Sequence, residues 1–201
     1  MLLLTAVAAL GAVDQATVVS LVHNRDAQGL KALGSGVMPV LARIYESSPP
    51  DERAEIAALF YQIGWKSPEA KRALLKDVHT QHQTLRLRAQ WALGRVSDDD
   101  DVVDVLLGNM QNDPSPLFRD KAACALAYDQ IHLSPQGKLR LYEGLIYALA
   151  DSKLQVRQIA LQALEILTGQ TKGFQPGASA EERYKTVGLW KKWLNDYRSH
   201  L

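Results

Sequence analysis

The sequence has few of the features that indicate a specific chemical function. Its 201 residues include one cysteine, Cys124, so no internal disulfide is possible, and a lone helical cysteine is usually a small buried hydrophobe. The formal net charge is +1 at pH 7, so no overall field favours nucleic acid or acidic lipid. No run of about 20 apolar residues occurs, so no segment is predicted to span a membrane.

Catalytic and metal-binding patterns are also missing. The histidines lack Glu or Cys neighbours at metal-ligand spacing, and the pair His79 and His82 is expected in a solvated turn. The glycine-rich segment 168–177 lacks the Gly-Lys-Ser/Thr ending of a phosphate-binding loop, and no nucleophile elbow, kinase or Rossmann pattern occurs. We therefore expect a protein that is not an enzyme and that uses no metal and no cofactor.

What the chain does have is a ten-residue phrase that occurs three times, at 85–94, 118–127 and 156–165. Its common form is apolar-Arg-x-x-Ala-x-x-Ala-Leu, which puts the apolar residues on one helical face, where alanines allow a neighbouring helix to approach. The separation of the first two arginines, Arg86 and Arg119, is the length of one helical-hairpin repeat. Self-similarity at this period predicts a stacked array of helix pairs.

A turn with an aspartate precedes two of the arginines. Asp113 lies six residues before Arg119, and Asp151 lies six residues before Arg157. An aspartate at a turn can accept backbone N–H bonds or cap the next helix, and an arginine one turn later can reach a carboxylate of its own or of an adjacent repeat. Thr80 occupies the aspartate position in the first copy, so we expect any ladder of such pairs to be interrupted there.

These residues resemble HEAT repeats, in which two antiparallel helices form each unit and the units stack into a right-handed superhelix. The strongest match is the stretch Met110-Gln-Asn-Asp-Pro-Ser-Pro-Leu-Phe-Arg119, followed by Ala122, Ala125 and Leu126. The resemblance covers residues 66–168 well and the rest loosely. It implies an all-α fold, a right-handed α-α superhelix of about five helical hairpins with a C-terminal capping helix. An ordinary helical bundle is the alternative.

The chain is predicted to form a single HEAT-like repeat domain over residues 1–201. Repeats are expected over 1–168, a glycine-rich loop over 169–178 and a capping helix over 179–201, which begins with the capping box Ser179-Ala-Glu-Glu182. In the capping helix Trp190, Trp193, Leu194 and Tyr197 share a face that is expected to cover the last repeat.

The start of the chain is interpreted as part of a repeat rather than as a secretion signal. Residues 2–10 are predicted to be the second helix of a partial repeat, so that the chain is either a fragment of a longer bacterial array or carries an added Met1. The sequence leaves the location unknown; the cytoplasm is favoured, and an extracytoplasmic location stays open if a signal or anchor precedes Met1.

Capping residues predict the other helices. Gly34, Gly64 and Gly94 are evenly spaced along the chain, as C-terminal caps of successive units would be. The expected helices cover residues 14–22, 27–33, 37–46, 51–63, 67–78, 84–95, 99–110, 116–128, 134–150, 153–167 and 179–199.

In such a superhelix the second helix of each unit lines the inner, concave side. The first, fifth and eighth positions after each arginine lie opposite the buried side, so they are expected on this inner surface. Exposed aromatic residues there would form a protein-binding hot spot, although for Trp91 packing in the core is the favoured interpretation. The expected partner-binding residues are Tyr61, Trp65, Leu87, Trp91, Cys124, Gln158 and Gln162.

Three functions follow as hypotheses. The first is a non-catalytic protein-interaction or scaffold module that binds a segment or helix of another protein. The second, for which the net charge gives little support, is a nucleic-acid-binding protein similar to HEAT-like DNA glycosylases, using the basic segment 66–95 and above all Lys71, Lys76, Arg88 and Arg95. The third is similar to HEAT-containing bilin lyases and would need the Cys124 thiol. The partner's identity and the oligomeric state stay open.

Overall fold

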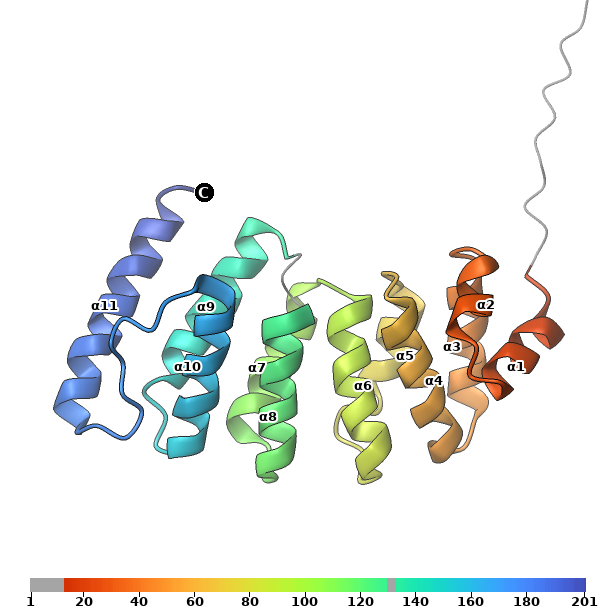
Figure 1. Ribbon diagram of the computed structural model, residues 1–201, viewed down its shortest axis with the longest axis horizontal. Helices are drawn as coiled ribbons and strands as arrows, with labels where there is room; N and C mark the ends of the chain where they lie inside the picture. Colours follow the sequence, from red (N-terminus) through yellow and green to blue (C-terminus); the bar gives the residue numbers. More distant parts are fainter. Residues whose placement is uncertain (1–12, 130–132) are drawn as a thin grey trace, which may run out of the picture.

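The computed structural model describes residues 13–129 and 133–201. Within these ranges the chain is helical, without strands, and the helices stand side by side in a row that runs from α1 to α11 (Figure 1). The predicted helix over residues 2–10 lies outside the described residues. The helices are α1 (Gln15–His23), α2 (Ala27–Ala32), α3 (Val37–Ser47), α4 (Pro50–Ile63), α5 (Pro68–Leu75), α6 (Gln83–Val96), α7 (Asp100–Asn112), α8 (Pro116–Cys124), the π-helical turn η1 (Ala125–Asp129), α9 (Pro135–Ala148), α10 (Leu154–Thr168) and α11 (Ala180–Arg198).

The helices form five successive pairs arranged in two layers. The second helices of neighbouring pairs pack on one another in the order α2, α4, α6, α8 and α10. Among the first helices, α1 packs on α3, α3 on α5 and α7 on α9, and α11 packs on α9. This is an α-α solenoid, as the arginine phrases predict. None of the described helices is both long and apolar enough to cross a bilayer.

Short polar side chains begin the helices as the sequence predicts. Asp14 accepts hydrogen bonds from the backbone N–H groups of the first turn of α1, and Ser67 caps α5 in the same way, with Pro68 in the first helical position. Ser179 and Glu182 form the predicted capping box at the start of α11. These caps satisfy N–H groups that have no partner within the helix.

The predicted glycine caps are only partly correct. Gly34 and Gly64 have φ values of +77° and +71°, the left-handed conformation that ends a helix. Gly94 does not end a helix: it is buried within α6, which continues to Val96. Gly169, with φ +69°, caps α10 and begins the glycine-rich loop.

The repeated phrases occupy equivalent positions in the core. The alanine three residues after each arginine is fully buried, and so is the leucine seven residues after it. A methyl group and an isobutyl group at fixed positions are therefore buried in each repeat, and burial of each leucine stabilises the fold by about 1.5–3 kcal/mol. These residues are Ala89, Ala122 and Ala160, and Leu93, Leu126 and Leu164.

The aspartates and arginines of the second and third copies make hydrogen bonds within their own turns. Asp113 and Asp151 each accept a backbone N–H bond inside their turns, from Ser115 at 2.9 Å and from Lys153 at 2.7 Å. Arg119 donates to the Asp113 carbonyl oxygen at 2.6 Å. Arg157 donates in the same way to the Asp151 carbonyl oxygen at 2.8 Å, so the arginines of these two repeats bind backbone carbonyls of their own turns.

The expected interruption at Thr80 does not occur. Arg86 donates from Nε to the Val78 carbonyl oxygen in its own turn at 3.3 Å, and it also pairs with Asp113 of the next repeat. One repeat earlier, Arg53 lies 3.5 Å from the buried carboxylate of Asp77. The ladder therefore starts before the first copy of the phrase.

The C-terminal segment closes the last repeat in two parts. Trp190 and Leu194 of α11 are buried, and the rings of Trp193 and Tyr197 lie 5.1 and 5.3 Å from that of Tyr142 on α9. The glycine-rich loop reaches α10 instead, where Arg157 donates to the Pro176 carbonyl oxygen at 2.8 Å. The helix and the loop thus contact different helices of the last pair.

Candidate partner-binding face

The exposed side of the second helices, here called the second-helix face, runs over α4, α6, α8 with η1, and α10. On it Tyr61 of α4 is 37% exposed, and Trp91 of α6 is half-buried, with its inner side packed against the core. Their ring centroids are 6.4 Å apart and the ring planes are tilted by 44°. Trp91 is therefore both a packing residue and part of the surface.

The π-helical turn changes this face. A regular helix was predicted to continue to Tyr128, but α8 ends at Cys124 and η1 follows. A π turn holds one residue more than an α turn, so the positions after it no longer follow the regular spacing. Ala127, the position predicted to face outward, is buried, whereas Tyr128 is 56% exposed.

Tyr128 was therefore not among the predicted partner-binding residues. The missed residue belongs to the site because η1 packs against both α6 and α10 and so holds Tyr128 between them. We find no signal in the sequence that distinguishes a π turn from a regular helix at this point.

A pocket of about 270 Å³ opens among these side chains. Aromatic rings, a half-buried thiol and a buried carboxylate make its walls. Burial, together with the charge of Asp120, raises the pKa of the Cys124 thiol, which keeps it protonated and a poor nucleophile at neutral pH. The lining residues are Tyr61, Trp91, Cys124, Tyr128 and Asp129.

Charge at the pocket comes from Asp129 and Arg95. Burial raises the pKa of Asp129, and the positive charges of Arg95 and Lys66 act in the opposite direction. Arg95 Nη1 lies 3.6 Å from Asp129 Oδ1, and its guanidinium carbon lies 5.6 Å from the centre of the Tyr61 ring. A cation is therefore held between an aromatic ring and a carboxylate at the edge of the pocket.

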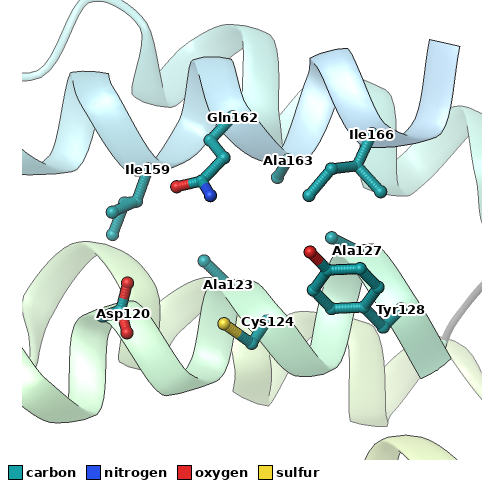
Figure 2. A pocket seen from close by; sticks show the side chains of 9 residues that line it. All are labelled: Asp120, Ala123, Cys124, Ala127, Tyr128, Ile159, Gln162, Ala163 and Ile166. Atoms are coloured by element: carbon teal, nitrogen blue, oxygen red, sulfur yellow. The ribbon is translucent and has the colours of Figure 1, made fainter. Parts of the chain in front are cut away.

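A narrow seam continues from this pocket toward the C-terminus. Figure 2 shows the side chains of Ile159, Gln162 and Ile166 on α10 facing Cys124 and Tyr128 across the seam. The cavity in it is about 20 Å³, enough for roughly one water molecule. The seam is a contact between repeats, and the larger pocket is the candidate site.

The structure groups only some of the predicted partner-binding residues. Tyr61, Trp91 and Cys124 line the pocket, and Gln162 lines the seam. The other three line neither cavity: Trp65 and Leu87 are half-buried and Gln158 is exposed.

The four basic residues lie on α5, directly after it at Lys76, and on α6, and each has an acidic partner elsewhere in the fold. These ion pairs join neighbouring helices rather than gathering into one cluster of cations. A phosphate ligand would have to compete with the carboxylates already there. The pairs are Lys71 with Asp99 (2.6 Å) and Asp101 (3.0 Å), Lys76 with Glu46 (2.5 Å), Arg88 with Glu55 (2.7 Å) and Arg95 with Asp129 (3.6 Å).

Comparisons with known proteins agree with this architecture. A protein-family model described as HEAT repeats matches residues 37–127, from the start of α3 into η1. No curated protein matches the chain. In the described part of the chain, no group of three or more His, Cys, Asp or Glu residues could hold a metal ion.

Proposed function

From the premise that the chain is a HEAT-repeat protein, we propose that it is a non-catalytic scaffold that binds an extended segment or a helix of another protein on its second-helix face. HEAT repeats are commonly protein-interaction scaffolds. Stacked repeats also present a continuous surface on which such a segment can lie.

One observation carries this proposal: the aromatic residues Tyr61, Trp91 and Tyr128 come from three successive second helices and line one pocket. Large aromatic side chains are usually inside a fold, and tyrosine and tryptophan dominate the binding energy of protein interfaces. The neutral thiol of Cys124 favours binding over covalent chemistry at the same place.

The test compares two exposed tyrosines. Tyr128→Ala removes a ring from the pocket, and Tyr147→Ala removes one that is 75% exposed on α9, in the other layer. Both variants should unfold at the wild-type temperature because neither ring is buried. We expect Tyr128→Ala to lose the proteins that the immobilised wild type captures from a lysate of its source, and Tyr147→Ala to keep them. Equal capture by both variants would show that the second-helix face is not the binding surface.

No observation favours the nucleic-acid-binding or the bilin-handling alternative over this function. The same material tests the first of them. Salt-dependent binding of duplex DNA that is lost in both Lys71→Glu and Arg88→Glu would support it.

A further inference from the structure

We propose that the pocket between Tyr61, Trp91 and Tyr128 receives a positively charged side chain, lysine or arginine, of the partner protein. This inference rests on the proposed function and names the group that enters the pocket.

The walls of the pocket attract cations. The face of an aromatic ring carries partial negative charge, and tryptophan attracts cations most strongly. Tyr61 and Trp91 are tilted by 44° and so form two walls of a corner rather than a stack, and Tyr128 adds a third ring. Among the described residues, no lysine or arginine lies over the ring of Trp91 or Tyr128.

The carboxylate of Asp129 supplies a negative charge in the wall of the pocket. Asp129 is buried, and the nearest nitrogen of Arg95 is 3.6 Å away, beyond the 2.7–2.9 Å of a charge-assisted hydrogen bond. An incoming ammonium or guanidinium would meet this carboxylate as well as the rings. An apolar side chain would leave the carboxylate without that contact, and an acidic one would be repelled by it.

Arg95 already shows this preference within the chain. Its guanidinium lies near both the Tyr61 ring and Asp129 at the edge of the pocket. The positive charge of Lys66 also acts on Asp129, in the direction that lowers its pKa. Arg95 is therefore an internal competitor for the same two groups. A partner's cation binds on the side of Trp91 and Tyr128 and shares Asp129 with Arg95 or displaces it.

The size of the pocket agrees with a single side chain. Its volume of about 270 Å³ lies below the roughly 300–1,000 Å³ of sites that enclose small molecules. A side chain that enters from a bound segment needs no more room than this.

The probes are acetylated and amidated peptides of sequence Gly-Gly-X-Gly-Gly, with X as lysine, arginine, norleucine or glutamate. Binding is followed by NMR through the indole N–H signal of Trp91, which Trp91→Phe identifies. We expect the lysine and arginine peptides to bind about tenfold more tightly than the norleucine peptide, since a cation–π contact contributes roughly that factor. The glutamate peptide should bind most weakly.

Two substitutions should change the affinity for the lysine peptide in opposite directions. Arg95→Gln removes the internal competitor and should tighten binding severalfold, and Asp129→Asn removes the charge and should weaken it severalfold. Arg140→Gln, which removes an exposed arginine that pairs with Asp104, should leave the affinity unchanged. Tyr128→Leu removes an exposed ring without changing the core. It should also weaken binding of the lysine peptide.

Three results would overturn the inference: a norleucine or glutamate peptide that binds as tightly as the lysine peptide, weaker binding by Arg95→Gln, or no shift of the Trp91 signal with any peptide. Capture of a protein that depends on Tyr128, together with peptides that show no preference for a cation, would leave the proposed function intact and reject this inference alone.

Discussion

Arg86 on α6 forms an ion pair with Asp113 at the end of α7, and the pair is nearly sealed from solvent, with side-chain exposures of 11% and 1%. The guanidinium also lies 4.3 Å from the centre of the Phe118 ring and donates to the Val78 carbonyl oxygen. One side chain therefore joins the turn before α6 to the helix pair that follows it.

Removing one partner of this buried ion pair should lower the free energy of unfolding. Asp113→Ala leaves the Arg86 charge buried without its carboxylate, and we expect the free energy of unfolding to fall by about 3–5 kcal/mol. The matched control is Asp104→Ala, which breaks an exposed pair with Arg140 and should cost about 0–1 kcal/mol. Urea denaturation measures both. If the two variants lost similar amounts of unfolding free energy, burial would not explain the contribution of the Arg86–Asp113 pair.

The sequence predicted the stacking but not every connection within it. Ala89, Ala122 and Ala160 were placed correctly because the spacing of small and apolar residues along a helix is a local property. The charged partners depend on distances between repeats, so it was open whether an arginine would bind its own repeat or the next. Both occur: Arg86 reaches forward to a carboxylate, and Arg119 also binds its own turn.

Gly94 shows the limit of spacing as evidence. Its even spacing with Gly34 and Gly64 suggested a cap, but a glycine also occurs inside a helix when it is buried against a neighbour. The π turn that exposes Tyr128 is a second case, because its geometry depends on how η1 packs between α6 and α10. Part of the pocket was therefore predictable, namely Tyr61, Trp91 and Cys124, and Tyr128 and Asp129 were not.

A second prediction concerns pH. Burial raises the pKa of Tyr45, and its hydroxyl donates to Asp77 at 2.7 Å, which raises the pKa further. Above about pH 10 the unfolded chain loses the tyrosine proton while the folded chain keeps it. The unfolded state then binds fewer protons, so the free energy of unfolding falls as pH rises.

Tyr45→Phe should remove the part of the fall in unfolding free energy at high pH that comes from this tyrosine. We expect the variant to be less stable at pH 7 by about 1–3 kcal/mol, because Asp77 loses a buried hydrogen bond, and the difference from wild type to shrink between pH 10 and 12. Tyr147→Phe, at an exposed tyrosine, is the control and should follow the wild-type curve. A constant difference across this range would show that Tyr45 ionises equally in both states.

Gln90 is the site of a predicted stabilisation. Its side chain is fully buried in α6, and neither amide atom has a hydrogen-bond partner among the described residues. Burying an amide without a partner costs about 1–3 kcal/mol, and methionine has a similar shape without that cost. Gln90→Met should therefore raise the free energy of unfolding by about 1–2 kcal/mol. Gln83→Met, at an exposed position of the same helix, should change it little; an equal gain there would point to helix propensity instead.

Two helical glycines should respond to alanine in opposite ways. At Gly108 of α7 an added methyl group meets no atom within 4 Å, so Gly108→Ala should raise the free energy of unfolding by about 0.5–1 kcal/mol through helix propensity. At Gly144 of α9 the same methyl group would overlap a terminal carbon of Leu107, on the helix that packs against α9.

Leu107 must therefore move in Gly144→Ala, and overpacking of this kind costs about 1–3 kcal/mol, more than the gain from propensity. We expect a net loss in thermal and urea unfolding. Gly144→Ala combined with Leu107→Ala tests the cause, because removing the isobutyl group makes room for the new methyl group. The added alanine should then be neutral or favourable in the Leu107→Ala background. If Gly144→Ala costs the same in both backgrounds, the contact between α7 and α9 does not explain the glycine.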